Sequence, residues 1–139
     1  MNKKIFLALI FIFILIILIS IFASNDRICF EKNCFNIEKA ISDSEKERGL
    51  MFREYLDRNS GMLFVYDKQD VRYFWMKDTL IPLDMIGLDE NLRIVDIHHA
   101  QPCVGDCEIY KIENSKYVLE INSNLTEKLN IKIGDRARL

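Results

Sequence analysis

PLDMIGLDENLRIVDIHHA, residues 82–100, contains the clearest indication of the fold. Two apolar runs, residues 82–89 and 92–100, meet at the polar segment Asp89-Glu90-Asn91. Two such runs around a short polar turn predict a β-hairpin. Both faces of the first strand are apolar, and Asp84 is the exception. We therefore expect Asp84 to be at least partly buried, although burying a carboxylate is costly.

Other β-prone segments lie on both sides of this hairpin. We expect a second hairpin over residues 28–40, paired strands at 61–66 and 71–76 across a polar turn, and strands at 116–122 and 134–139. Helices are expected over 42–56, where Gly49 can interrupt the helix, and over 123–130. The pattern has no βαβ alternation. It predicts a mainly β (α+β) domain, a small antiparallel β-sandwich or barrel with two short helices.

Residues 5–22 form an apolar run in which Ser20 is the one polar residue. A helix of this length spans about 27 Å, close to the hydrocarbon thickness of a bilayer. Lys3 and Lys4 favour a cytoplasmic N-terminus. We therefore expect residues 1–24 to be a transmembrane signal-anchor and residues 25–139 to be one domain outside the cytoplasm. The alternative is a cleaved signal peptide, and the domain is then secreted.

The domain is mildly acidic and contains four cysteines. Without the two N-terminal lysines, 17 basic residues face 21 acidic ones, a net charge of −4. This charge and the lack of a basic cluster argue against nucleic-acid binding. The cysteines fall in two close pairs, Cys29/Cys34 and Cys103/Cys107, and an extracytoplasmic location favours disulfides. Four cysteines allow three pairings, of which the local one, 29–34 with 103–107, is the simplest.

Several sequence blocks occur in an order typical of one family. They are ERGLMFRE (47–54), GMLFVY (61–66), FWMKDTLIPLDMIGLDE (74–90), IV (94–95), QPC (101–103), YVLEIN (117–122) and IKIGDRARL (131–139). Together they resemble the DUF192 (UPF0127) family of uncharacterised bacterial and archaeal proteins over about residues 35–139. The resemblance implies a compact, mainly β domain of jelly-roll-like type that is often exported. It implies no established activity.

The chain departs from the usual family pattern at two places. Asp78 stands where the family has Asn after Met-Lys, and this adds a negative charge beside the motif. Ser123-Asn124 stands where the family has a small residue followed by Gly. We expect Asn124 to take any left-handed backbone conformation that Gly would adopt, because Asn tolerates that region.

Asp84 and Glu120 are carboxylates within otherwise apolar strands. Because a buried carboxylate needs donors or a cation, we expect Asp84 either to form an ion pair with Arg48, Arg53 or Lys77 or to accept hydrogen bonds from backbone N–H groups. Glu120 is expected to pair with Arg48 or Lys77. The alternative for Asp84 is a functional one. It would be the polar end of a ligand pocket floored by Trp75 and Met76.

These residues define one predicted binding surface. Its members are Arg48, Arg53, Trp75, Lys77, Asp84 and Glu120. The guanidinium groups of Arg48 and Arg53 suit a carboxylate or phosphate of a ligand, or they cross-link the loop that carries them. If Asp84 and Glu120 converged on one cleft, they could instead act as the acid/base pair of a hydrolase.

His98 and His99 precede Cys103 and Cys107, a set that could hold zinc. Oxidation of the cysteines opposes this, as does the rule that adjacent strand residues point to opposite faces. We therefore expect neither a metal nor another cofactor.

The sequence thus favours a membrane-tethered binding or accessory module over an enzyme. Its partners would be the membrane and an unidentified small molecule, glycan or envelope protein. An envelope hydrolase that uses Asp84 and Glu120 is one alternative, and a metal-binding protein is another.

Overall fold

The computed structural model describes residues 10–13 and 26–139. The predicted membrane segment lies outside the described residues, apart from a helical turn at 10–13. Within the described ranges, no helix is long and apolar enough to cross a bilayer. The domain contains β1 (Arg27–Phe30), β2 (Asn33–Ala40), α2 (Asp43–Arg48), β3 (Ser60–Trp75), β4 (Leu83–Leu88), β5 (Ile94–Ala100), β6 (Ile109–Asn122), α3 (Leu125–Lys128) and β7 (Ala137–Arg138).

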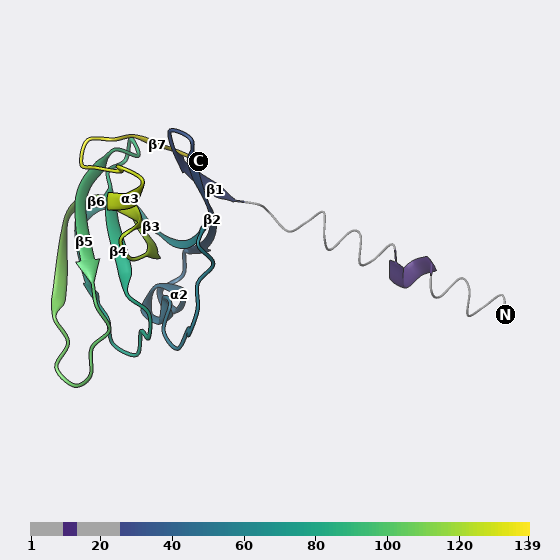
Figure 1. The fold of residues 1–139 in the computed structure, drawn as a ribbon, viewed down its shortest axis with the longest axis horizontal. Coiled ribbons are helices and arrows are strands. Elements are labelled where there is room, and N and C mark those ends of the chain that lie inside the picture. Colours follow the sequence, from purple (N-terminus) through teal and green to yellow (C-terminus); the bar gives the residue numbers. More distant parts are fainter. Residues whose placement is uncertain (1–9, 14–25) are drawn as a thin grey trace.

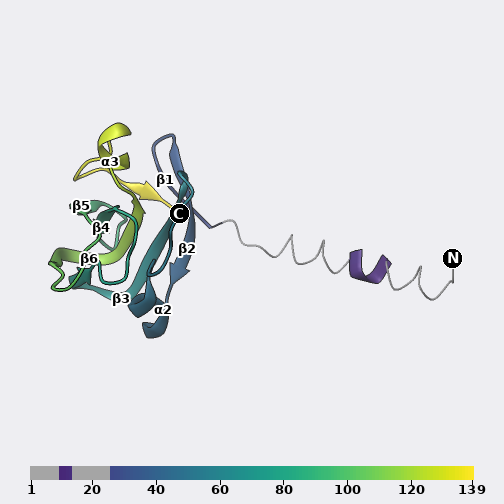
Figure 2. The same cartoon turned by 60° about the horizontal axis from the view of Figure 1, so that its bottom comes forward.

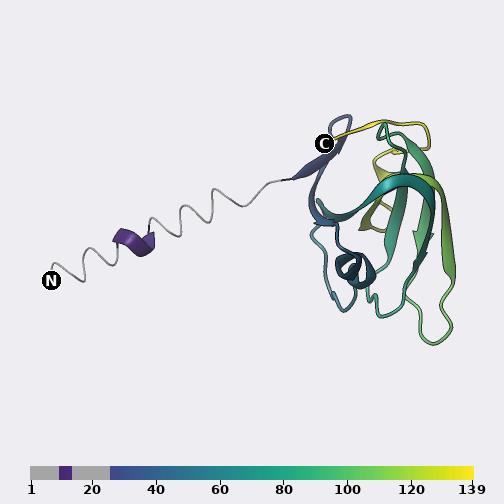
Figure 3. The same ribbon diagram turned by 180° about the vertical axis from the view of Figure 1, so that it is seen from behind.

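The seven strands form one sheet in the order β5-β4-β6-β3-β2-β1-β7. The sheet curves into a half-barrel, and Figure 3 shows β3 crossing from the β1–β2 side to the β4–β6 side. The expected mainly β class with two short helices is confirmed. The strands belong to one continuous curved sheet rather than to two packed sheets, so the architecture is closer to the barrel alternative than to a sandwich.

Both predicted hairpins are confirmed. Strands β4 and β5 pair in antiparallel fashion, with Asp84 opposite His99. Strands β1 and β2 also pair in antiparallel fashion, and the cross-strand partners Cys29 and Cys34 form a disulfide. A second disulfide joins Cys103 to Cys107 in the connection between β5 and β6. The local pairing of cysteines is therefore the one that the structure adopts.

The prediction of two short strands at 61–66 and 71–76 is wrong. These segments are halves of the single strand β3, and both pair with β6. The polar residues expected to form a turn, 67–70, lie where the β3–β6 register shifts between Val65 and Asp70. Such an irregularity bends a strand without ending it, and it allows β3 to follow the curve of the half-barrel.

The expectation of purely antiparallel pairing fails at one place, because β2 and β3 are parallel. Parallel neighbours need a crossover connection, and residues 41–59 with α2 supply it. The helix is shorter than the predicted 42–56 because it ends at Gly49. Gly49 has a φ of 48°, and an added Cβ would lie 3.2 Å from the Phe64 ring. Both facts favour glycine at this position.

The two faces of the sheet carry separate hydrophobic cores. One core includes Leu63, Ile86 and Leu119, and Leu125 of α3 packs into it. The other includes Phe64, Met85 and Val118, and Leu50 beyond α2 packs into it. Figures 1 and 2 show α2 and α3 well apart in the fold. Each face therefore has its own helix and its own environment for a buried polar group.

Candidate functional site

Asp84 is fully buried on the α3 face and is surrounded by donors. Its Oδ1 accepts hydrogen bonds from His99 Nδ1 at 2.8 Å and from the Asn124 amide at 3.0 Å. Its Oδ2 accepts from the amide of Thr126 at 2.9 Å and from its hydroxyl at 2.7 Å. Asp84 thus anchors the first turn of α3 to β4.

The predicted ion pair of Asp84 with Arg48, Arg53 or Lys77 is wrong, whereas the alternative of a carboxylate that accepts backbone N–H hydrogen bonds is confirmed. The donors are a histidine and the α3 segment, and two of the four are backbone amides. Asn124 takes the left-handed conformation expected of it, with φ 64°. That conformation begins the turn that presents its amide to Asp84. The contacts make Asp84 a structural carboxylate.

Glu120 is the other buried carboxyl, and its surroundings differ. It is 5% exposed and lies on β6 opposite Met62 of β3 and Met85 of β4. No group in the described part of the chain forms a hydrogen bond or ion pair with it. Burial is the one cause that raises the pKa of the Glu120 carboxyl, to about 8. The expected pairing with Arg48 or Lys77 is therefore absent from the described residues, and Glu120 is mostly protonated at neutral pH.

Glu120 lies in a small pocket between the sheet and the end of α2. The cavity volume is about 30 Å³. Its walls combine apolar and aromatic side chains with polar ones, and charged residues of α2 form much of the exposed part of the lining. The lining consists of Lys46, Glu47, Arg48, Gly49, Leu50, Met51, Phe64, Phe74, Trp75, Thr79 and Glu120. We call this space the Glu120 pocket.

Helix α2 places the charged mouth of the Glu120 pocket. Ser42 caps the helix, because its hydroxyl accepts from the Glu45 amide at 3.3 Å and its own amide donates to Glu45 Oε2 at 2.8 Å. This is a capping box, which defines where a helix begins. The Glu45 carboxylate accepts hydrogen bonds from the amide and the hydroxyl of Ser42 and from the Ile41 amide, and these three bonds lower its pKa. The helix then carries Lys46 and Arg48 to the pocket within a single turn.

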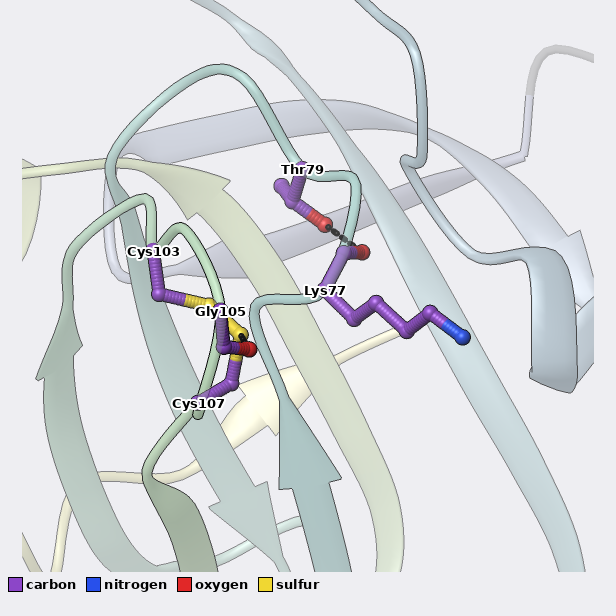
Figure 4. Close-up of a disulfide and its surroundings, with 5 residues drawn as sticks. All are labelled: Lys77, Thr79, Cys103, Gly105 and Cys107. Atoms are coloured by element: carbon purple, nitrogen blue, oxygen red, sulfur yellow. Dashed lines mark hydrogen bonds between the residues drawn. A yellow bond between two sulfur atoms is a disulfide. The ribbon is translucent and has the colours of Figure 1, made fainter.

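Trp75 and the turn that follows it form another wall. Trp75 is 45% exposed, and the Lys77 ammonium lies 5.2 Å from the centre of its ring, within range of a cation–π contact. The Thr79 hydroxyl donates to the Lys77 carbonyl at 3.3 Å. Figure 4 shows Lys77 extending away from the Cys103–Cys107 disulfide. Lys77 therefore lies against the Trp75 ring but does not line the Glu120 pocket.

Arg53 does not reach the Glu120 pocket. Its guanidinium donates two hydrogen bonds to Glu38, at 2.7 Å and 2.5 Å. This partner lowers the pKa of Glu38 and raises that of Arg53. Arg53 and Arg48 both line a neighbouring cavity of about 410 Å³. Arg53 thus cross-links its loop to β2, which is the structural alternative for this residue.

The carboxylate pair of the hydrolase hypothesis does not form. Asp84 lies opposite Ile121, and Glu120 lies opposite Met85. Directly paired residues point to the same face of a sheet, and their neighbours point to the other. Asp84 and Glu120 consequently lie on opposite faces and cannot act together on one substrate.

The predicted zinc set is also separated. Cys103 and Cys107 are joined as a disulfide. His98 contacts Asp96 at 3.2 Å, whereas His99 donates to Asp84. Among residues 10–13 and 26–139, no three His, Cys, Asp or Glu side chains are arranged to hold a metal ion.

Of the six predicted surface residues, the structure gathers Arg48, Trp75 and Glu120 around one pocket. The sequence reasoning missed Lys46 and Thr79 there, and it missed Thr126 as a partner of Asp84. Alternation along β3 and β6 does place Phe64 and Glu120 on one face. No local pattern connects either strand with the helix that covers it.

The family pattern of DUF192, described as an uncharacterised ACR, matches residues 27–139. A crystal structure of a protein of unknown function from Novosphingobium aromaticivorans is similar, with 36% identity and a TM-score of 0.72, over 77% of this chain and 76% of that one. A structure described as a putative transcription regulator from Sinorhizobium meliloti has 30% identity and a TM-score of 0.70, over 81% and 89%. No curated protein shows significant similarity to the chain.

Proposed function

This chain belongs to the DUF192 family, and from the geometry of the Glu120 pocket we propose that it is a binding module rather than an enzyme. We further propose that the module lies outside the cytoplasm and is tethered to the membrane by its N-terminal segment. The family is described as uncharacterised, and the similar protein from Novosphingobium aromaticivorans is described as one of unknown function.

One observation carries the proposed binding role. Glu120 is a buried carboxyl in a pocket, and no described residue contacts it through a hydrogen bond or an ion pair. A buried polar group without a partner destabilises a fold. Such a cost is typical of a site that awaits a ligand. Asp84 shows that this fold can fully satisfy a buried carboxylate.

The remaining features support a non-catalytic role at the cell envelope. The second acid at the pocket, Glu47, is an exposed residue of α2, so the pocket has no second buried carboxyl. Both cysteine pairs are oxidised, and the described part of the chain has no free cysteine. Disulfides favour an oxidising compartment. The net charge of −4 outside the N-terminal segment disfavours binding to a phosphate backbone.

A ligand panel tests the binding role. We expect at least one class of small molecule or glycan fragment to raise the thermal midpoint of the full-length protein in detergent. The same ligand should not change the thermal midpoint of the Glu120→Leu variant, because that variant lacks the polar end of the pocket. Glu108→Leu, which alters an exposed glutamate outside the pocket, should respond like wild type. An equal shift in wild type and Glu120→Leu would place binding elsewhere and contradict the proposal.

The location is tested separately. A C-terminal fusion to a phosphatase that folds only after disulfide formation should be active, and the full-length chain should stay in the membrane after alkaline extraction. Deletion of residues 5–22 should abolish both results. Mass spectrometry of the mature N-terminus separates an intact anchor from a cleaved signal. An inactive fusion would contradict an extracytoplasmic location.

A further inference from the structure

The charges at the Glu120 pocket narrow the class of ligand, provided that the proposed binding function holds. Lys46 and Arg48 contribute two cations to the lining, and Glu47 contributes one exposed carboxylate. Arg53 is held by Glu38. By contrast, Arg48 has no ion-pair partner within the described segments. The mouth is therefore electropositive and provides a guanidinium that is not engaged by an acid.

The size and walls of the pocket narrow the class further. A cavity volume of about 30 Å³ holds roughly one or two water-sized groups. A small planar end of a ligand can therefore reach Glu120, while its body stays at the mouth. The lining includes the buried ring of Phe64 together with Phe74 and the more exposed Trp75. Aromatic walls suit an organic group beside the polar end rather than a fully hydrated ion.

We infer that the Glu120 pocket receives the terminal carboxylate of a small organic acid. One carboxylate oxygen accepts a hydrogen bond from the Glu120 carboxyl, and the other pairs with the Arg48 guanidinium. The planar fork of arginine matches a carboxylate. A carboxyl that keeps its proton in an apolar site is a strong donor to an anion.

The protonation of Glu120 agrees with this arrangement. Burial raises its pKa to about 8, so below that pH it can donate a proton in a hydrogen bond. The charged groups around it are Lys46, Glu47 and Arg48 of α2, and Tyr66 of β3 is a further titratable neighbour, whose pKa is raised by burial and also by the Glu120 charge. An ammonium ligand would need an ionised Glu120 and would meet the positive charges of Lys46 and Arg48. The two ligand classes therefore predict opposite effects of pH on affinity.

Trp75 is the one tryptophan of the chain and lines the pocket, so its fluorescence reports binding directly. Full-length protein in detergent is titrated with sodium propionate, propionamide and propylammonium chloride at constant ionic strength, at about pH 6.5 and about pH 9. We expect propionate to change the Trp75 emission. Its affinity should fall about tenfold at the higher pH, because Glu120, with a pKa of about 8, then loses its proton.

Three variants test the assigned contacts. Glu120→Gln keeps a donor of similar size, so it should still bind propionate, and its affinity should no longer depend on pH. Arg48→Gln should weaken binding about tenfold at both pH values, as expected for the loss of one charge-assisted contact. Arg58→Gln, a matched change of an arginine outside the pocket, should bind like wild type.

The contrary outcomes separate this inference from the proposed function. Suppose that propylammonium instead binds more tightly at high pH and fails to bind Glu120→Gln. That result would contradict a carboxylate ligand, but it would agree with the proposed binding function. Equal propionate binding in wild type, Glu120→Gln and Arg48→Gln at both pH values would place the ligand elsewhere and overturn the inference. The inference would also be overturned if none of the three probes changed the Trp75 emission. If, in addition, no compound of the ligand panel raised the thermal midpoint, the proposed binding function would be contradicted as well.

Discussion

Two buried carboxyls on neighbouring strands of one sheet have opposite surroundings. Asp84 on β4 accepts four hydrogen bonds beneath α3, whereas burial alone sets the pKa of Glu120 on β6. The difference arises from the helices. The first turn of α3 directs amides into the sheet, whereas the end of α2 leaves a pocket and places Lys46 and Arg48 at its mouth.

Burial of a carboxyl therefore does not by itself indicate whether it has a structural role or a ligand-binding role. A satisfied carboxylate ties elements together, and removing it leaves its donors unpaired. An unsatisfied carboxyl weakens the fold, and removing it relieves that cost. The same type of substitution should therefore have opposite effects on the two faces of the sheet.

The largest expected effect is at Asp84. Replacement by Ala should lower the free energy of unfolding by about 4 kcal/mol, because buried donors of α3 lose a charged acceptor. Urea denaturation of the full-length protein in detergent measures this change. Asp84→Asn retains one acceptor oxygen and should lose less. If Asp84→Ala lost less than about 1 kcal/mol of stability, the claim that Asp84 stabilises the fold whereas Glu120 destabilises it would be contradicted.

Glu120→Leu should stabilise the protein by about 2 kcal/mol near pH 8, because an apolar side chain replaces a desolvated carboxyl. The folded pKa of about 8 lies above the ordinary pKa of a glutamate carboxyl, 4.5. Between these values the unfolded chain releases a proton that the folded chain retains, so wild-type stability falls as pH rises. The gain in the variant should grow over the same interval. Denaturant midpoints from pH 4 to pH 9 check this slope, and equal slopes in both proteins would contradict it.

Thr126→Val sharpens the comparison by removing one donor to Asp84. The lost hydroxyl bond of 2.7 Å should cost about 1.5 kcal/mol, as is usual for a hydrogen bond to a charged group. Thr79→Val is the matched control on the other face, since its hydroxyl makes a weak 3.3 Å bond to a backbone carbonyl. Thermal midpoints compare the two, and we expect the larger loss for Thr126.

The smallest expected effect concerns the cap of α2. Ser42→Ala removes the capping hydroxyl and should lower stability by about 1 kcal/mol. Because α2 positions Arg48, the substitution should also lower the affinity of the Glu120 pocket for its ligand. Ser44→Ala, two residues further on, provides the control, because the Ser44 hydroxyl contacts the Ser42 hydroxyl at 3.3 Å but makes none of the capping hydrogen bonds to Glu45. Equal stability of the two variants would show that the capping box contributes little.

Local patterns predicted much of the fold. Alternating apolar runs around polar turns indicated the hairpins β1–β2 and β4–β5, and close spacing indicated both disulfides. The same rule failed at β3, where polar residues lie within a bent strand rather than in a turn. A bulge and a turn have similar local composition, and only the partner strand distinguishes them.

Local sequence patterns were enough to predict most of the strands, residues 67–70 of β3 excepted, and to place Asp84 and Glu120 in apolar ones. The tertiary structure alone decided their partners. The donors to Asp84 lie 15, 40 and 42 residues away along the chain, beyond the reach of any local pattern. The register of β4 against β6 decided that the two carboxyls face opposite sides, because a shift of one residue would exchange the faces. Register depends on packing across the whole sheet, so no short stretch of sequence specifies it.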